Sequence, residues 1–319
     1  MTRRGDHPPT CRLCGAAGAE SLGTIADSDF FAGRVLSQPL PGGRLWRCRH
    51  CDSMFRHPIL ASEAYLRLYQ EGAPEQWSGE GNRRDLQLVR AIIAVRPGVQ
   101  TVLDVGCGTG DFLTSLPGTL ARFGIEPSTA AAAQAAARGV SIAGSSVERL
   151  PPEMRFDVIT LIDVIEHLPD PAAMLDLLCR HLSANGIAII STGDPQCVAW
   201  RVLKSRFWYS SFPEHISFPS HRFFEQWQAD GGAGPLSKRH TRYRHLPYWQ
   251  WALYGIIQAG YFVSPSLFNW AGRAAGRLGW LQPQRRFFSP GVPGLFVDHQ
   301  VVTIQRAAQG DALTNRKSA

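Results

Sequence analysis

Charged residues and methionines are scarce in this chain of 319 residues. Only 18% of the residues are charged and 4 are methionine, whereas 44% are hydrophobic. A disordered chain has high charge and few apolar residues, so this composition excludes disorder and predicts a globular chain with a substantial core. The first residues, MTRRGDHPPTCRLCG, contain no apolar run. We therefore expect no secretory signal and a cytoplasmic protein.

The positive charge is concentrated in the C-terminal part of the sequence. The chain has a net charge of +7, and residues 200–319 contain 15 Lys and Arg against 5 Asp and Glu. This basic part favours an anionic partner, such as a membrane surface, a phosphorylated substrate or nucleic acid. A plain solvated surface accounts for the same charges equally well.

Four of the seven cysteines form two C-x-x-C pairs, CRLCG and CRHC. Two such knuckles supply the four thiolates that structural zinc prefers, although the gap between them exceeds the commonest spacing. Disulfides are disfavoured in a chain without an export signal. The expected zinc ligands are Cys11, Cys14, Cys48 and Cys51, with His50 as a fallback. Three cysteines are expected to pack in the core: Cys107, Cys179 and Cys197.

The order of the hydrophobic patterns predicts an α/β protein in four parts. Residues 1–60 form the cysteine module, and residues 61–98 form a helical connector or lid that contains EAYLRLY. An alternating βα core covers 99–245 and resumes with a last strand in 295–307, and an aromatic-rich insertion fills 246–294. Repeated βα units imply a parallel sheet covered by helices.

A turn with three glycines follows the first strand of the core, in the segment VLDVGCGTGDF. Residues 101–105 are apolar and β-branched, as a buried parallel strand requires, and residues 111–113 can open a helix. Glycines in such a turn let the main chain approach a ligand closely. A dinucleotide fingerprint would place a third glycine where Asp111 stands, so NAD and FAD are disfavoured.

The spacing G-x-G-x-G after LDV resembles motif I of the class I S-adenosylmethionine-dependent methyltransferases. The strand ARFGIE then ends at Glu126, and the strand FDVITLI is followed by Asp163 and VIEHLPDP. The strand GIAIIST completes an order that is similar to the quinone O-methyltransferase branch. The resemblance covers roughly residues 99–230 and the last strand. It implies a Rossmann-like seven-stranded sheet, mostly parallel with an antiparallel last strand, behind a small zinc ribbon.

The same resemblance implies S-adenosylmethionine as the cofactor, bound at the carboxyl ends of the strands. A carboxylate at Glu126 can accept both ribose hydroxyls. Such enzymes often carry an acidic residue near the adenine, and here Ser146 and the backbone of Val147 take its place. The expected cofactor-binding residues are Asp104, Gly106, Gly108, Gly110, Glu126, Ser146, Val147 and Asp163.

Two stretches are candidates for the chemistry of methyl transfer. In the first, Asp163, Glu166 and His167 resemble the acid-x-x-Glu-His pattern that holds a divalent metal in quinone O-methyltransferases, so Mg²⁺ is a candidate there. His167 could instead act alone as the base, or serve only to orient a loop.

The second stretch is FWYSSFPEHISF, residues 207–218, which we expect to form a substrate lid. Its Glu214 and His215 form a pair in which a carboxylate can tune the imidazole as a base near neutral pH. A buried histidine with a structural role is the alternative for His215. The expected catalytic residues are His215, His167 and Glu214.

The sequence therefore predicts a methyltransferase that acts on oxygen or carbon of a small molecule: a glycan, a lipid-linked or phosphorylated compound, or a natural product. The zinc head before a methyltransferase domain also resembles ribosomal RNA methyltransferases, and arginines 44, 47, 49 and 56 lie around the second knuckle. Strands with paired stacking aromatics are missing from the pattern, which disfavours nucleic acid. A non-catalytic assembly subunit with the same fold is the other alternative.

Residues 246–272 contain no Asp, Glu, Lys or Arg. Prolines and several polar residues within this run argue against a membrane span. Its aromatic residues suit either a cap over the active site or contact with a membrane surface, where the following arginines would meet anionic headgroups. We expect residues 246–286 to serve one or both purposes, with peripheral contact at the inner face of the membrane.

Overall fold

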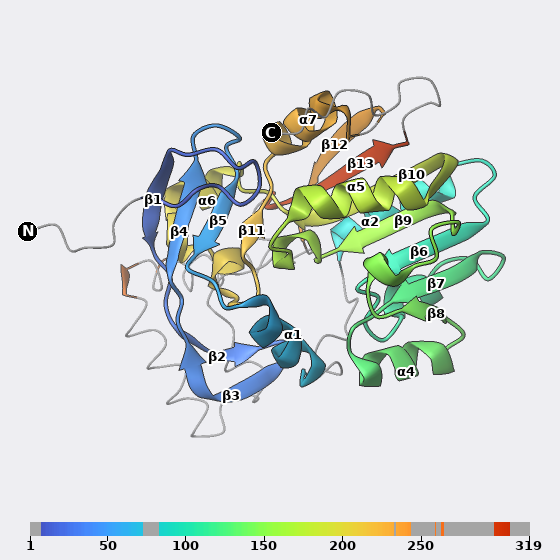
Figure 1. Cartoon of the computed structure of the whole chain (residues 1–319), viewed down its shortest axis with the longest axis horizontal. Helices are drawn as coiled ribbons and strands as arrows, with labels where there is room; N and C mark the ends of the chain where they lie inside the picture. The colour runs from blue at the N-terminus through green and yellow to red at the C-terminus, as the bar shows by residue number, and fades with distance from the viewer. Residues whose placement is uncertain are drawn as a thin grey trace, which may run out of the picture.

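The computed structural model describes residues 8–72, 83–232, 234–243, 259, 263–264 and 297–306. A seven-stranded sheet forms its centre, and a smaller four-stranded sheet lies beside it (Figure 1). Across the larger sheet the strands are β12 (Leu236–Thr241), β13 (His299–Gln305), β10 (Leu182–Gly193), β9 (Phe156–Ile162), β6 (Thr101–Val105), β7 (Ala121–Ile125) and β8 (Ser141–Gly144).

The direction of the strands confirms the fold class expected from the sequence. Strands β10, β9, β6, β7 and β8 pair in parallel, whereas β13 runs antiparallel to both β10 and β12. From β6 the chain continues to β7 and β8 on one side, and β9 returns to the other side. This reversal of the strand order makes the end of β6, where the glycine turn lies, the place where such sheets bind ligands.

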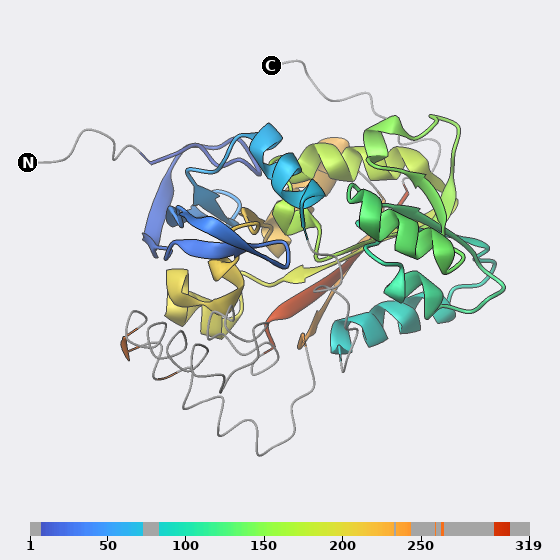
Figure 2. The ribbon, with the colours of Figure 1, turned by 90° about the horizontal axis from the view of Figure 1, so that it is seen from below.

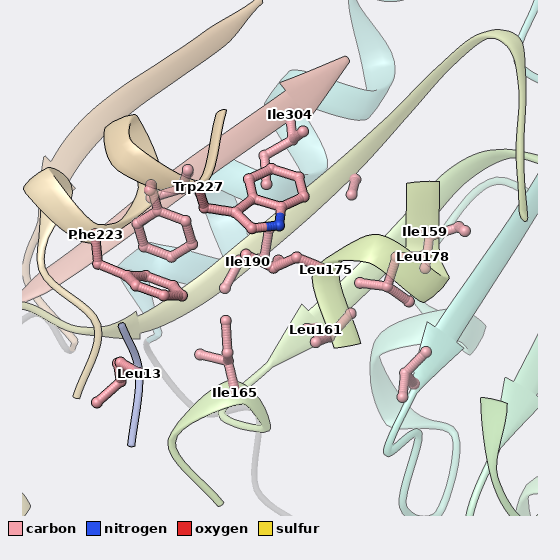
Figure 3. Close-up of a cluster of buried hydrophobic side chains, with 14 of the residues drawn as sticks. Leu13, Ile159, Leu161, Ile165, Leu175, Leu178, Ile190, Phe223, Trp227 and Ile304 are labelled. Carbon is pink, nitrogen blue, oxygen red and sulfur yellow. The ribbon is translucent and has the colours of Figure 1, made fainter. Parts of the chain in front are cut away.

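Helices cover both faces of the large sheet because successive strand residues point to opposite faces. Ile189 packs in the cluster with α2 (Arg84–Ala94), and its neighbour Ile190 packs in the cluster with α5 (Pro171–His181) and α7 (His221–Trp227). Figure 3 shows Trp227 and Leu175 lying over Ile190 and Ile304. The remaining helices are α1 (Ser62–Gln70), α3 (Asp111–Thr114), η2 (Val147–Arg149), α4 (Thr129–Ala137), η3 (Ile165–His167), α6 (Val198–Leu203), η4 (Lys204–Arg206), η5 (Trp208–Ser211) and η6 (Gln228–Gly232).

The helices begin where the sequence places capping residues. The Asp170 side chain accepts a hydrogen bond from the backbone N–H of Ala173, and Pro171 occupies the first position of α5. Ser128 and Ser220 cap α4 and α7 in the same way. Such caps satisfy backbone N–H groups that lack partners within the helix, and they fix the residues just before each helix.

The four-stranded sheet combines the cysteine module with a segment from much later in the chain. It contains β1 (Ala19–Thr24), β4 (Arg44–Cys48), β5 (Met54–His57) and β11 (Ser217–Phe218) in that order. The module also carries a two-stranded hairpin, β2 (Ser28–Phe31) and β3 (Arg34–Leu40). Figures 1 and 2 show the helix α1 leaving the module between the two sheets. Because β11 pairs with β5, the cysteine module and the βα core share a sheet.

The predicted insertion at 246–294 lies outside the described residues except for 259 and 263–264, so the choice between a cap and a membrane-surface element stays a prediction. Within the part of the chain that the structure describes, no helix has both the length and the apolar character needed to cross a membrane.

Candidate active site and cysteine centre

The three glycines of the turn all adopt left-handed backbone conformations. Their φ angles are +75° at Gly106, +52° at Gly108 and +80° at Gly110, a region that only glycine enters without strain. The N–H of Gly106 donates to the Ile125 carbonyl at 2.8 Å, so the turn folds back over the end of β7. A Cβ at Gly108 would meet nothing within 4 Å. The turn therefore leaves open space above Gly108, as a backbone cradle for a ligand requires.

Glu126 lies beside this cradle, directly after β7. Its Oε2 accepts a hydrogen bond from the N–H of Gly108 at 2.9 Å, and its Oε1 accepts one from the N–H of Ser128 at 2.8 Å. The residue is only 6% exposed, and burial raises the pKa of its carboxyl group. Each carboxylate oxygen retains a lone pair for one further donor. The structure thus brings the predicted Glu126 against the glycine turn.

The other predicted cofactor residues lie around the same strand ends. Asp104 is buried in β6 and its Oδ1 accepts a hydrogen bond from the Thr160 hydroxyl at 2.6 Å. Ser146 is half-buried before η2, and Val147 is buried in the core. Asp163 follows β9 with a φ of +53°.

An arginine that the sequence analysis did not single out binds Asp163. The guanidinium of Arg83 lies 2.7 Å from Oδ2 of Asp163 and 2.5 Å from Oδ2 of the buried Asp85. The Cζ atom of Arg83 also lies over the Tyr243 ring, 4.3 Å from the ring centroid. No motif in the sequence marks Arg83, because its partner is 80 residues away and only the fold brings the two together.

Four ionisable residues gather next to the end of β9 and are called the reaction cluster: Glu166, His167, Glu214 and His215. His167 is half-buried and the other three are buried. The imidazole rings of His167 and His215 meet edge to face with their centroids 4.9 Å apart. The Nδ1 atom of His215 lies 2.7 Å from the Tyr209 carbonyl oxygen. A carbonyl only accepts, so Nδ1 carries the proton and Nε2 keeps its lone pair.

Hydroxyl groups contact two other members of the reaction cluster, Glu166 and His167. Glu166 accepts hydrogen bonds from Tyr209 at Oε1 and from Thr192 at Oε2, the latter at 2.8 Å. The Tyr69 hydroxyl lies 2.5 Å from Nδ1 of His167. Tyr69 comes from α1, so the predicted connector does reach the candidate site. Tyr69 and Tyr209 were not predicted as site residues, because a tyrosine in an amphipathic pattern is indistinguishable from a core residue.

Glu214 has one carboxylate oxygen without a partner. Its Oε1 accepts a hydrogen bond from the N–H of Ala32 at 3.4 Å, whereas the buried Oε2 has no hydrogen-bond partner in the described part of the chain. Burial raises the pKa of the Glu214 carboxyl group. A buried oxygen without a partner costs free energy unless a ligand supplies the donor.

Burial sets the protonation of the reaction cluster. It lowers the pKa of His215 well below 6.5 and also lowers that of His167, so both imidazoles are neutral at neutral pH. Burial, together with the charge of Asp163, raises the pKa of Glu166 to about 8. The cluster therefore offers a neutral imidazole base and a carboxyl group that can carry a proton.

The residues expected to bind Mg²⁺ do not form a fitting site. The group whose ligand atoms all lie within 4.8 Å of one another contains Glu166, His167 and His215. Asp163 instead pairs with Arg83, and both oxygens of Glu166 accept hydrogen bonds from hydroxyls. One carboxylate and two imidazoles do not suit Mg²⁺, which prefers oxygen ligands.

The four cysteines of the module form a second cluster. The sulfur atoms of Cys11 and Cys51 are 3.8 Å apart, and those of Cys14 and Cys48 are 3.6 Å apart. A disulfide would need about 2.05 Å, whereas a tetrahedral zinc with bonds of about 2.3 Å places its sulfurs about 3.8 Å apart. All four sulfurs lie within 4.8 Å of one another. The donor set and its spacing fit structural zinc, and the fallback ligand His50 is exposed and outside this group.

The remaining cysteines pack as expected. Cys107 and Cys197 are buried in hydrophobic clusters, and Cys179 packs against the core from α5. Burial raises the pKa of the Cys179 thiol to about 12, as it does for Cys197.

The glycine turn and the reaction cluster lie in a region that matches a known protein family. A family model described as a methyltransferase domain matches residues 69–233. The ubiquinone biosynthesis O-methyltransferase of Serratia proteamaculans is 30% identical over an alignment of 150 residues, and the match covers 41% of this chain and 61% of that protein. The enzyme of the same name from Azotobacter vinelandii is 35% identical over an alignment of 107 residues, and the match covers 31% of this chain and 46% of that protein.

The chain thus spans less than two thirds of the length of these curated relatives. Among solved structures, an S-adenosylmethionine-dependent methyltransferase from Thermotoga maritima is 19% identical with a TM-score of 0.48, over 76% of this chain and 98% of that one. The family match covers half of the chain and includes the glycine turn, Glu126 and the reaction cluster. The chain therefore belongs to the methyltransferase domain family.

Proposed function

We propose that this protein transfers a methyl group from S-adenosylmethionine to an oxygen or carbon atom of a small molecule. One observation carries the proposal. The reaction cluster lies at the end of β9, and β9 pairs with β6, whose glycine turn forms an open cradle with Glu126. Methyl transfer needs a cofactor site and an adjacent base, since the acceptor must be aligned with the methyl group and lose its proton.

The cradle would hold S-adenosylmethionine through residues already in place. Bound there, the cofactor supplies an electrophilic methyl group on sulfur. Glu126 would accept hydrogen bonds from the ribose hydroxyls, and the open space above Gly108 would admit the ligand against the main chain. The proposed cofactor contacts at the neighbouring strand ends are Asp104, Gly106, Gly110, Ser146, Val147 and Asp163.

His215 would remove the proton from the acceptor. Its Nδ1–H is held by the Tyr209 carbonyl, so the basic nitrogen is Nε2, and burial keeps the imidazole neutral at physiological pH. His167 is held by Tyr69 at the edge of the same ring and would orient it. The unpartnered Oε2 of Glu214 would accept a hydrogen bond from the acceptor.

The acceptor class follows from charge as well as from the site. An excess of Lys and Arg in residues 200–319 favours an anionic acceptor, such as a phosphorylated glycan or a lipid-linked compound. A natural product is also compatible with the site. A cytoplasmic protein that touches the inner membrane face would encounter lipid-linked acceptors directly.

We further propose that the four-cysteine cluster binds one structural Zn²⁺. Four thiolate charges within 4.8 Å of one another would repel strongly, so a cation is needed to hold all four sulfurs as thiolates. Such a site contributes directly to folding rather than to the reaction.

Calorimetric titration with S-adenosylmethionine tests the cofactor site. We expect micromolar affinity for the wild type, weakened about tenfold or more by Glu126→Ala because a hydrogen bond to a charged group is lost. Glu148→Ala, on an exposed residue of η2, should bind like the wild type. A folded protein that binds no cofactor would overturn the proposal.

A second experiment identifies the acceptor. The protein is incubated with methyl-labelled S-adenosylmethionine and a bacterial lysate, and the lipid, polar-metabolite and RNA fractions are separated. We expect label in the lipid or polar fraction. Label in RNA alone would replace the small-molecule acceptor with RNA, and no label in any fraction would favour a non-catalytic subunit.

A further inference from the structure

Arg56 of β5 carries a guanidinium group inside the protein. The residue is only 2% exposed, although it belongs to the small cysteine module. Burial lowers the pKa of the guanidinium to about 10. A buried charge costs free energy unless hydrogen bonds satisfy it, so the partners of Arg56 are informative.

Those partners are main-chain carbonyls of the loop that carries the reaction cluster. Nη2 donates to the carbonyls of Ser210 and Phe212, both at 2.7 Å, and Nε donates to that of His215 at 3.2 Å. Nη1 donates to Gly42 of the module at 2.8 Å. The planar guanidinium thus fixes three carbonyls of residues 210–215 at once, which needs the fork geometry of an arginine.

The backbone of the cysteine module also binds the loop that carries Glu214 and His215. The N–H of Arg56 donates to the Ile216 carbonyl at 2.9 Å, and the next residues of the loop pair with β5 as the strand β11. The Ser220 hydroxyl then donates to the carbonyl of the zinc-site residue Cys51, and the N–H of Ser220 donates to Oγ of Ser53 at 3.0 Å. The segment 210–220 is therefore held along its length by the second cysteine knuckle and the strand that follows it.

We propose that Arg56 is a positioning residue for His215, through which the cysteine module forms part of the active-site scaffold. The inference rests on the proposed role of His215 as the base. The Tyr209 carbonyl that holds Nδ1 of His215 directly precedes Ser210, whose carbonyl binds Arg56. The segment 210–215 is thus fixed at both ends by the Arg56 side chain, which binds the carbonyls of Ser210 and His215. The module completes the site rather than standing beside it as a separate domain.

Replacing Arg56 tests this role. Arg56→Met keeps an unbranched apolar stem but removes every donor, and Arg56→Lys keeps the charge without the fork. Arg44→Met is the matched control, because Arg44 lies on the neighbouring strand β4 with an exposed side chain. The readout is the ¹⁵N spectrum of histidine-labelled protein, with the His215 signals assigned by their loss in His215→Gln.

In the wild type we expect a single Nδ1–H tautomer for His215 that does not titrate between pH 6 and 8. In Arg56→Met we expect mixed tautomers and a pKa that moves toward the ordinary value of about 6.5, together with a loss of turnover of about a hundredfold if the ring moves by 1 Å. S-adenosylmethionine affinity and zinc content should stay unchanged. Arg56→Lys should be intermediate, and Arg44→Met should match the wild type.

An unchanged His215 spectrum in folded Arg56→Met would overturn the proposal. If Arg56→Met does not fold, Arg56→Lys decides, and a wild-type spectrum in that variant would overturn it as well. Full turnover in His215→Gln is a separate outcome. That outcome would show that His215 is not the base. The ¹⁵N spectrum of Arg56→Met would still decide whether Arg56 positions the ring.

Discussion

The Nδ1 atom of His215 and the carbonyl oxygen of Tyr209 lie 2.7 Å apart, six residues along the same buried loop. This contact decides the chemistry available to the ring, because it places the proton on Nδ1 and leaves Nε2 as the acceptor. The Tyr209 ring lies over the same imidazole, with the two centroids 4.3 Å apart. Tyr209 therefore sets the tautomer of the proposed base through its carbonyl and packs against the ring with its side chain.

Replacing His215 should affect turnover far more than cofactor binding. We expect His215→Gln to lower kcat by about a hundredfold or more, the usual contribution of a general base, with unchanged affinity for S-adenosylmethionine. Turnover is measured with labelled cofactor and the acceptor fraction that takes up label. His221→Gln is the control, because that imidazole pairs with Glu225 on α7, 3.3 Å away. Equal turnover in the wild type and His215→Gln would leave His215 with a structural role only.

The buried His215 should also make the stability of the protein depend on pH. Burial lowers its pKa well below 6.5 in the folded state, so the histidine is neutral in the folded and unfolded states above that pH. Below pH 6.5 the unfolded chain binds a proton there and the folded protein does not. The free energy of unfolding should then fall by up to about 1.4 kcal/mol per pH unit through this residue.

His215→Gln isolates this contribution from those of other groups. The stability of the wild type relative to the variant should decrease as the pH falls from 7 to 5, measured by urea denaturation at each pH. The stability of the variant is subtracted from that of the wild type because His299 changes the stability with pH in the opposite direction. Its pKa is raised despite its burial, chiefly by Asp298, so it favours the folded state at low pH. A stability difference that is the same at every pH would contradict a buried neutral imidazole at His215.

Local sequence signals predicted the sheet, the glycine turn and the cysteine cluster. The alternation of apolar strands and helices identified β6 to β10, most clearly at the largely buried strands β6, β9 and β10. The glycines at 106, 108 and 110 indicated a turn between a strand and a helix, and the structure has them between β6 and α3. The paired C-x-x-C spacing was sufficient to predict a cluster of four sulfurs.

Contacts between distant segments could not be predicted in the same way. Arg56 appeared in the sequence as one of several arginines around a knuckle, although its side chain reaches residues about 155 positions later. The pairing of β5 with β11 is equally invisible, since a two-residue strand has no periodicity. The ion pair between Arg83 and Asp163 likewise depends on the strand order, which brings the start of α2 to the end of β9.

Metal analysis should find one zinc per chain. Cys48→Ala should lose the metal and lower the melting temperature, because three thiolates leave the tetrahedral shell incomplete and zinc binding is coupled to folding. Cys179→Ala is the control, since Cys179 belongs to α5 and is not one of the four grouped cysteines, and this variant should keep its zinc. Zinc content that is unchanged in Cys48→Ala would show that the ligands lie elsewhere.

Alanine substitutions at three glycines can separate an effect on cofactor binding from an effect on stability. Gly106, Gly108 and Gly139 all have positive φ angles, so alanine at each costs about 1–2 kcal/mol of stability through backbone strain alone. A Cβ at Gly106 would also come within 2.6 Å of Cγ2 of Val164, whereas Gly108 and Gly139 have nothing within 4 Å. Gly106→Ala should therefore be the least stable of the three in urea denaturation.

Gly108→Ala and Gly139→Ala should have similar stability but differ in cofactor affinity. The methyl group of the first would occupy the open space of the cradle, whereas Gly139 lies between α4 and β8, outside the turn. We expect calorimetric titration to give an S-adenosylmethionine affinity at least about tenfold weaker for Gly108→Ala, since a displaced ligand loses one or more hydrogen bonds to the turn. Gly139→Ala should bind like the wild type. Equal affinities in the two variants would mean that the space above Gly108 is not where the cofactor binds, and Glu126 would then hold the turn without contacting a ligand.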